Sequence, residues 1–420
     1  MKKQLVLILI ILSFNYANSQ VQLTLEECYS KAYTNYPLIK QKQYIEQSKD
    51  YNVSNVWKGY LPQVTLNGQV TYQSDVTSLP ISIPGIQIES LTKDQYKAYA
   101  DVSQLIYDGG LVSTQADIQK SLADVEEQKV ETELLKVKES VNQIYFGILS
   151  LDLQIKQLES VKNDLDESLA KLNASLENGI ATKTNVDILK AEVLNVDQRF
   201  IELMSSRKAY LTMLGLLINS RLSDSTVLAI PPQEIIPAQV EINRPELKMF
   251  SYQINVIENQ RGLTLAKILP KASLFFQGGY GKPTLDMLKN NFDWYYVAGL
   301  RLTWAISNLY TNSNENEINL LNKNIIDVQQ ETFSLNTNIA IEQQLIEINK
   351  LKELINIDEE IIELRTSVKE SVKSQLENGV VTSSDYIREL NSEDRAKQNL
   401  AIHTIQLLMV QYKHKLTVGY

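Results

Sequence analysis

The sequence predicts an α+β membrane protein in which a few long strands are joined to much longer helices. Three observations lead to this fold class. Four segments alternate strictly between apolar and polar residues, residues 110–176 contain no proline, and the second half of the chain repeats the first. The composition agrees, because glycine (15) and proline (10) are scarce among 420 residues, which favours long uninterrupted elements.

The chain contains one internal duplication. Asn35-Tyr36-Pro37 returns as Asn243-Arg244-Pro245, at an offset of 208 residues, whereas Leu176–Gly179 returns letter for letter as Leu376–Gly379, at an offset of 200. The difference falls in residues 73–93, which we expect to form a surface loop because loops vary most in length. We therefore divide the chain into a signal peptide (1–19), a first repeat (20–217), a linker (218–242) and a second repeat (243–420).

The N-terminus carries the features of an export signal. Lys2 and Lys3 precede an apolar run over residues 5–12, and Ala17-Asn18-Ser19 supplies small residues for cleavage. This run is too short to span a bilayer, and no later stretch reaches about 18 apolar residues. Residues 1–19 are therefore predicted to be a secretory signal peptide, which leaves an exported soluble protein as the simplest alternative.

Four segments are predicted to be strands, at residues 60–73, 95–107, 268–281 and 292–306. Each places apolar residues at alternate positions, although Gln104 breaks the face of the second. Such strands exceed the length of about five or six residues that is usual in globular proteins, and they fit the 9–11 residues of a tilted membrane strand. Aromatic side chains near the segment ends, Tyr60, Tyr72, Trp294 and Trp304, are predicted to lie at the membrane interfaces. A piece of a soluble β-sandwich remains the alternative.

Four membrane strands cannot close a barrel by themselves. About eight are the minimum, and lipid tolerates no open sheet edge. The sequence therefore predicts a transmembrane β-barrel that several chains assemble, with four strands from each chain.

The rest of the chain is predicted to be helical. Apolar residues at spacings of three, four and seven, including Leu354, Ile361 and Val368 in the second copy, indicate coiled-coil packing. About 66 residues of helix give about 100 Å, more than twice the thickness of a bilayer. Each long helix ends at Asn-Gly, which suits a left-handed helix cap, before a second helix returns over 184–217 or 384–416. The two turns are Glu177-Asn178-Gly179 and Glu377-Asn378-Gly379.

Composition argues against several other classes of protein. A net charge of −9 disfavours nucleic acid as a partner, and the single cysteine, Cys28, excludes an intrachain disulfide. His403 and His414 are eleven residues apart on the last predicted helix and could share a face, but no third ligand stands nearby. No nucleophile–histidine or paired-carboxylate pattern occurs. We therefore expect no enzyme activity, no cofactor and no metal site.

An ordered set of motifs resembles the TolC-type outer-membrane efflux proteins. They are Leu23-Thr24-Leu25-Glu26-Glu27, Asn35-Tyr36-Pro37, Tyr60-Leu61-Pro62, Gln104-Leu105-Ile106-Tyr107-Asp108-Gly109, Asn243-Arg244-Pro245-Glu246-Leu247 and the two Glu-Asn-Gly turns. The resemblance covers almost the whole mature chain. It implies a homotrimer with a twelve-stranded barrel in the outer membrane, continued by a periplasmic α-helical coiled-coil barrel. It also implies docking of the turns to a periplasmic adaptor and an inner-membrane pump, for efflux or type I secretion.

The same resemblance implies where the channel narrows. The family carries acidic rings just after the second Gly turn; Asp385 matches the first ring position, whereas Arg388 departs from the second. Asn185 matches an aspartate that usually links neighbouring helix pairs, and Leu376 and Val381 match its usual tyrosine and arginine partners. The family's gate contacts are therefore altered here. Alternatively, Asp385 is a solvated acid that is favourable at a helix N-terminus.

Three classes of function remain open. The first is a transport conduit, and the second is a secreted or periplasmic coiled-coil structural protein. The third is a hydrolase, for which no catalytic residues stand out. Dependence on detergent separates the first two classes, because only a membrane barrel needs detergent to remain a trimer.

Overall fold

A computed structural model describes residues 22–77, 90–179, 181–237 and 241–420. The chain forms two compact units, each built from separate stretches of sequence. The sheet unit comprises Lys42–Lys129 and Glu246–Glu331, and the tip unit comprises Met1–Gln41, Val130–Pro245 and Thr332–Tyr420. The predicted signal peptide lies outside the described residues, as do residues 78–89 of the predicted surface loop.

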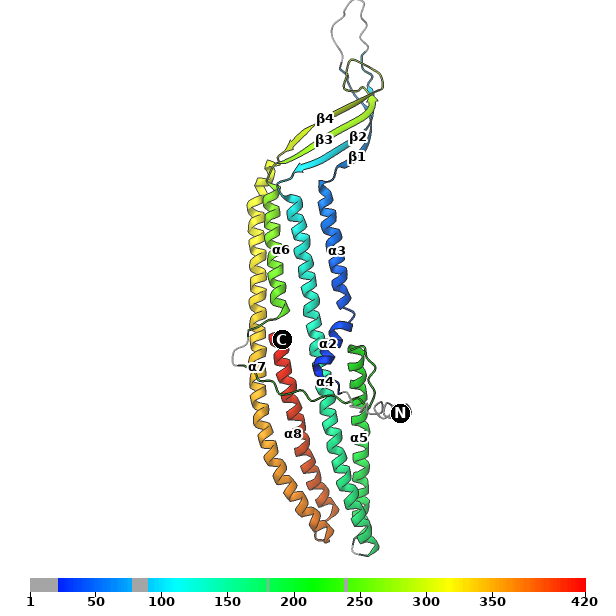
Figure 1. Ribbon diagram of the computed structural model, residues 1–420, viewed down its shortest axis with the longest axis vertical. Coiled ribbons are helices and arrows are strands. Elements are labelled where there is room, and N and C mark those ends of the chain that lie inside the picture. Colours follow the sequence, from blue (N-terminus) through cyan, green and yellow to red (C-terminus); the bar gives the residue numbers. More distant parts are fainter. Residues whose placement is uncertain (1–21, 78–89, 180, 238–240) are drawn as a thin grey trace, which may run out of the picture. The chain divides into compact units, whose positions relative to one another are not determined.

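The sheet unit contains one four-stranded antiparallel sheet in the order β1-β2-β3-β4 (Figure 1). The strands are β1 (Gln63–Tyr72), β2 (Asp94–Tyr107), β3 (Lys271–Lys282) and β4 (Asp293–Thr303). The two repeats meet where β2 pairs with β3, for example at Ala98 and Tyr280. The outermost strands β1 and β4 each pair with one neighbour in the chain, so the sheet has two open edges.

Three predicted strand ends were wrong by a few residues. Residues Lys58–Tyr60 form the 3₁₀ helix η1, and β1 starts after Pro62; likewise β3 starts after Pro270. Proline has no N–H to donate to a strand ladder, so a strand starts most readily after it. At the other end β4 stops at Thr303, before the 3₁₀ helix η2 (Ile306–Asn308).

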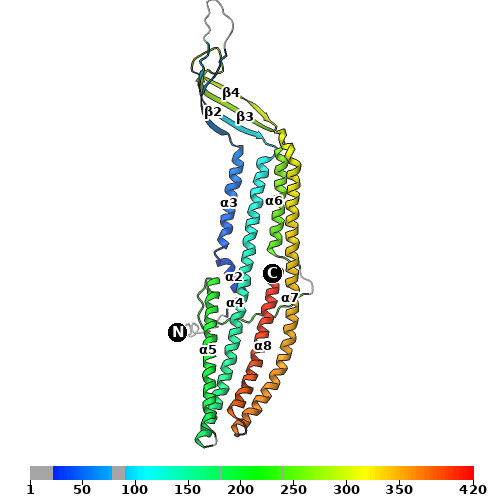
Figure 2. The same cartoon turned by 180° about the vertical axis from the view of Figure 1, so that it is seen from behind.

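The sheet unit also holds α6 (Pro245–Lys267), most of α3 (Ile39–Trp57), and the first parts of α4 (Leu111–Glu177) and α7 (Leu309–Glu377); Figure 2 shows these helices from behind. The repeated Asn-x-Pro motif stands at the start of α3 and of α6. Pro245 is the first residue of α6, where proline costs no hydrogen bond. Pro37 separates α3 from α2 (Leu25–Asn35), so the N-terminal segment of the first repeat is two helices.

The tip unit contains α2, α5 (Lys183–Leu217), α8 (Ser383–Val418) and the last parts of α4 and α7. Leu158, Leu165 and Leu172, which are seven residues apart on α4, are buried in a core shared by α4, α5, α7 and α8. The coiled-coil packing predicted for the first repeat is thus confirmed. None of the described helices is long and apolar enough to cross a membrane.

One apolar row on α7 faces outward from the chain. Ile361 is 40% exposed, Leu364 68% and Val368 43%. The coiled-coil packing predicted for this row is therefore not made within the described part of the chain. A heptad row needs a facing helix, and no facing helix covers this row within the part of the chain that the structure describes.

Within the tip unit, a buried arginine of α5 holds the linker that follows this helix. Arg207 donates to the carbonyl oxygens of Asp224 (2.6 Å) and Thr226 (2.8 Å) and forms an ion pair with Asp152. Tyr145 also holds the linker: it is buried in a hydrophobic core of the tip unit, and its hydroxyl donates to the carbonyl oxygens of Leu23 and Ala229. Burying a charged or polar group costs free energy unless the group is paired or hydrogen-bonded, and these contacts supply the partners of Arg207 and Tyr145.

Candidate functional site

The two Glu-Asn-Gly turns have the same geometry and lie at helix ends within the tip unit. Gly179 and Gly379 adopt left-handed conformations, with φ of 75° and 71°. Their N–H groups donate to the carbonyl oxygens of Leu176 and Leu376, both at 3.0 Å. Glycine suits this position because a Cβ atom disfavours positive φ.

Asp385 caps the N-terminus of α8. Its backbone N–H donates to Thr382 Oγ1 (3.3 Å), and its carboxylate accepts from the Thr382 N–H (3.1 Å) and hydroxyl (2.7 Å). Together these contacts form a capping box, which satisfies donors that the helix itself leaves free. The hydrogen bonds from Thr382, assisted by the charge of Arg388, lower the pKa of Asp385. Asp385 therefore has a structural role in a single chain.

The structure brings Asp385 and Arg388 together, as their three-residue spacing predicted. Arg388 Nη2 lies 3.4 Å from Asp385 Oδ1, and Arg388 Nε lies 3.2 Å from Glu389 Oε1. Both Asp385 and Arg388 keep solvent-exposed side chains. Asn185 is not part of this group: its N–H donates to Thr182 Oγ1 at the start of α5.

A cavity of about 550 Å³ lies between the two turns in the tip unit. Its apolar wall includes Leu172 and Leu376, and Lys171 and Lys373 add positive charge. Asn185 lines this cavity, whereas Asp385 and Arg388 are absent from its lining. The three residues predicted for the constriction thus occupy two different places in a single chain.

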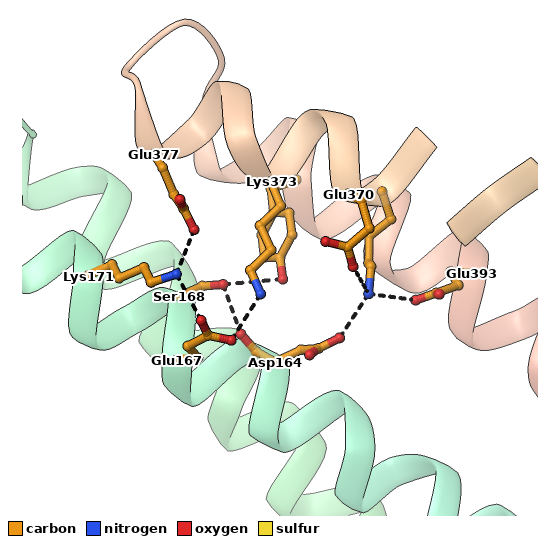
Figure 3. A network of polar contacts seen from close by, with 10 residues as sticks. Asp164, Glu167, Ser168, Lys171, Glu370, Lys373, Glu377 and Glu393 are labelled. Atoms are coloured by element: carbon orange, nitrogen blue, oxygen red, sulfur yellow. Dashed lines mark hydrogen bonds and ion pairs between the residues drawn. The ribbon is translucent and has the colours of Figure 1, made fainter. Parts of the chain in front are cut away.

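Three ion pairs cross from α4 to α7 close to the turns (Figure 3). We call them the tip ladder: Asp164–Lys369 (3.0 Å), Glu167–Lys373 (3.0 Å) and Lys171–Glu377 (2.9 Å). Glu167 also pairs with Lys171 (2.8 Å), which joins two rungs of the ladder. Hydrogen bonds from Lys171, and then from Lys373, lower the pKa of Glu167 to about 2. The ladder joins the two helix pairs of a single chain.

The rung farthest from the turns is buried and reaches a third helix. Lys369 pairs with Asp164 and Glu370 (2.9 Å), and also with Glu393 (3.2 Å) on α8. Glu393 is itself buried, and it accepts from Thr366 (2.7 Å). Burial lowers the pKa of Lys369, but its acidic partners outweigh this effect and raise it. Lys369 is therefore a charged group that links α4, α7 and α8.

The sequence-based search missed the tip ladder because the two repeats do not share it. Lys369 and Lys373 correspond, at the offset of 200, to Leu169 and Asn173 in the first repeat. The ladder instead pairs each α4 residue with an α7 residue 205 or 206 positions later. The available signal was a pair of lysines four residues apart on one long helix and a pair of acids three residues apart on the other.

One face of the sheet is apolar and exposed, and the other is polar. The exposed apolar face carries large side chains from all four strands: Val64, Leu66, Val70, Tyr72, Tyr96, Leu274, Phe276, Tyr280, Trp294, Tyr296, Leu300 and Leu302. The opposite face carries residues such as Asn67, Asp101 and Gln277, together with Arg301 over the Phe275 ring at 4.7 Å. Contiguous exposed apolar surface of this kind marks an interaction site.

The predicted interfacial aromatics lie at both ends of the strands. Tyr72 and Trp294 stand at the loop end of the sheet, and both are exposed. Trp304 stands at the helix end, and its indole N–H donates to the carbonyl oxygen of Ile268 (3.0 Å). Tyr60 is also at the helix end, within η1, and it stacks on Trp57 at 5.9 Å.

Asp108 of the Gln104–Gly109 motif joins the sheet to α4. Its Oδ1 atom accepts from the Tyr60 hydroxyl (3.0 Å) and the Gly110 N–H (2.9 Å), and its Oδ2 atom accepts from the Val112 N–H (2.7 Å). Burial raises the pKa of Asp108, but these hydrogen bonds outweigh burial and lower it. The motif therefore serves to start a helix directly after a strand.

The two histidines occupy different surroundings. His403 Nδ1 lies 2.5 Å from Asp358 Oδ2, between α8 and α7. His414 is buried, and neither of its ring nitrogens has a hydrogen-bond partner among the described residues. Within the same residues, no group of three or more histidines, cysteines or acids is placed to hold a metal ion.

Residues 28–220 match the model of the outer membrane efflux protein family. This match, over nearly half of the chain, confirms the resemblance that the motifs indicated. No match was found among curated proteins.

Solved structures extend the likeness to nearly the full chain, and three of them illustrate it. CusC aligns with a TM-score of 0.73 at 13% identity, over 95% of this chain and 92% of its own. The outer-membrane channel OprN gives 0.70 at 13% identity, over 94% and 90%. The MtrE outer membrane channel of Neisseria gonorrhoeae gives 0.69 at 14% identity, over 94% and 88%. At these identities, the likeness establishes the fold.

Proposed function

We propose that this chain is one protomer of a homotrimeric outer-membrane channel with a twelve-stranded β-barrel. The observation that carries the proposal is the four-stranded sheet, with its two open edges and its exposed apolar face. Lipid tolerates no open sheet edge, so β1 of one chain must pair with β4 of the next. The similar structures support this proposal. OprN and MtrE are described as outer-membrane channels, and CusC is described as forming a transmembrane channel.

The strand lengths suit a membrane barrel. β4 has 11 residues, and at about 3.3 Å per residue it is about 36 Å long. At a tilt of about 45°, such a strand crosses about 26 Å, close to the apolar band of about 25 Å in outer-membrane barrels. Trp294 is the second residue of this strand and Trp304 directly follows it, so the two side chains would lie at opposite membrane interfaces.

The exposed helix faces support contacts between copies in the tip unit. The outward row on α7 comprises Ile361, Leu364 and Val368. On α5, Leu194 and Ile201 are also exposed and lie seven residues apart. Pairing these rows between neighbouring chains would bury both and would form the periplasmic coiled-coil barrel. The helix turns would then lie at the periplasmic end of the channel.

The channel is proposed to receive substrates from a periplasmic adaptor and an inner-membrane pump, as in efflux or type I secretion, and to release them outside the cell. The two turns at 177–179 and 377–379 are the proposed adaptor contacts. The residues of both turns are exposed, and with the cavity between the turns they offer a surface on which a partner turn could dock.

The constriction is proposed to lie beside the second turn, where Asp385 and Arg388 from three chains form a ring, with Asn185 at the matching place of the first repeat. Because Arg388 offsets part of the carboxylate charge, Arg388→Asp should raise cation selectivity and block by multivalent cations. Asp385→Ala should lower both. Single-channel recordings in planar bilayers measure these quantities, and unchanged values in both variants would exclude the pair from the pore.

The function is tested by fractionation of cells that produce the full chain. We expect the protein in the outer membrane, as a trimer that survives mild detergent and dissociates on heating. Leu300→Arg on the apolar face should reduce this trimer, because an arginine near the middle of a lipid-facing strand costs about 2–4 kcal/mol. The matched variant Val297→Arg, on the opposite face of the same strand, should leave it intact. Recovery of the native chain as a soluble periplasmic monomer would reject the proposal.

A further inference from the structure

The turn between β3 and β4 exposes apolar side chains in a segment that ought to be polar in water. It lies at the end of the sheet away from α6, because β3 starts next to α6 and runs toward the turn (Figure 1). Leu285 is 61% exposed, Met287 60% and Leu288 63%. Three of four consecutive residues thus present apolar surface outward.

Asp286 and Asn290 of this turn make contacts within the protein. Asp286 Oδ1 accepts from the Leu288 N–H (3.1 Å), and its other carboxylate oxygen pairs with Lys289 (3.5 Å). Asn290 Oδ1 accepts from both the N–H (3.2 Å) and the hydroxyl (3.3 Å) of Thr92. These contacts hold the turn in one conformation. The apolar side chains are thus exposed beside Asp286 and Lys289, which also face outward.

The turn continues directly from the aromatic end of the exposed apolar face. The Phe292 ring follows the turn and stacks on Tyr280 at 5.6 Å, and it lies 6.0 Å from the Tyr96 ring. The Trp294 ring lies 5.2 Å from Tyr280. Tyr96, Tyr280 and Trp294 all belong to the apolar face described above, so the turn extends that surface beyond the strands.

We propose that Leu285, Met287 and Leu288 form an anchor that inserts into the outer leaflet of the membrane. The inference rests on the proposed barrel, which places the aromatic side chains at the lipid interface. An apolar segment next to such aromatics, followed by Lys289 with its flexible charged side chain, suits the boundary between acyl chains and headgroups. The occupant of this surface is lipid, and the anchor fixes how deep the barrel sits.

The test is fluorescence quenching on the full-length protein in liposomes. Met287→Cys is labelled with an environment-sensitive dye, and two quenchers are compared, a nitroxide carried near the lipid headgroup and aqueous iodide. Cys28 is buried and its thiol pKa is raised to about 12, so the engineered cysteine labels selectively. Asp75→Cys, on an exposed residue just after β1, is the matched control.

At position 287 we expect loss of emission with the lipid-borne nitroxide and little effect of iodide, and at position 75 the reverse. Quenching of position 287 by iodide would show a turn in water and would overturn the proposal. Protection from both quenchers would show that a neighbouring copy covers the turn, which would overturn it equally. Leu300→Cys, on the apolar face of β4, separates the two claims: if the lipid nitroxide fails to quench it, the barrel itself is rejected.

Discussion

Replacing Lys369 with methionine should loosen the tip unit far more than replacing any exposed member of the tip ladder. The side chain is buried and pairs with Asp164, Glu370 and Glu393. Removing one partner of a buried ion pair costs about 3–5 kcal/mol, because the remaining charge stays buried without compensation. Glu393 keeps its contacts to Lys397 (2.9 Å) and Thr366 (2.7 Å), so the lower end of this range applies.

Hydrogen exchange measured by mass spectrometry on the native trimer is the appropriate assay. A cost of about 3 kcal/mol corresponds to about 150-fold faster exchange in the peptides around residues 366–377 and 386–397. Lys171→Met is the matched control: its side chain is about half exposed, so water screens its ion pairs and they contribute little to stability.

A second variant separates the loss of charge pairing from general damage to the core. In Lys369→Met with Glu393→Met, both buried charges are absent, so exchange should be slower than in the single variant. Equal exchange in Lys369→Met and Lys171→Met would refute the reasoning. It would show that the buried rung contributes no more than an exposed one.

Three further outcomes follow from the described contacts. Asp108→Asn should destabilise the start of α4 by about 1–3 kcal/mol, since an amide has one acceptor oxygen where the buried carboxylate uses two, and faster exchange over residues 110–114 would show it. The lowered pKa of Glu167 means that its contribution is present above its ordinary value of 4.5 and is lost as the pH falls toward about 2. Exchange near the turns should therefore rise with acid, and Glu167→Gln should remove that part of the response. Gly379→Val should abolish export by the host's pump without changing the amount of trimer, because valine opposes the left-handed turn, and Gly179→Val should do the same. Export and heat-dissociable trimer are measured on the same cells, and export that persists with both turns altered would place docking elsewhere.

Much of the fold could be predicted because its elements are long and regular. Alternation of apolar and polar residues located all four strands, and the helix that the sequence placed over residues 110–176 is α4 (Leu111–Glu177). The errors lie at strand ends, where local turn chemistry decides. Tyr60 continues the alternation of β1, yet Pro62 separates the two, and the tyrosine joins a 3₁₀ helix and bonds to Asp108.

The contacts around the turns were harder to predict because they depend on how helices face each other. Periodicity indicated that Ile361 and Val368 share a face, but it could not show that this face points away from the chain. The link between Lys369 and Glu393 joins α7 to α8, and no pattern within either helix reveals it. Asp385 shows the opposite case: its place three residues after Thr382 is the sequence pattern of a helix cap, and the structure contains that cap.

Pairing of β1 with β4 between chains is the central claim, and disulfide cross-linking tests it directly. Cysteine is placed at Asn67 on β1, together with a second cysteine at Tyr295, Val297 or Gly299, which lie on the same face of β4. We predict that at least one of these three variants yields covalent dimers and trimers of the chain in the outer membrane, resistant to heating and sensitive to reductant. The control pair of Asn67 with Gln277, on the interior strand β3, should yield none. Absence of inter-chain disulfides in all three variants, with the thiols still open to a small reagent, would contradict the closed trimeric barrel.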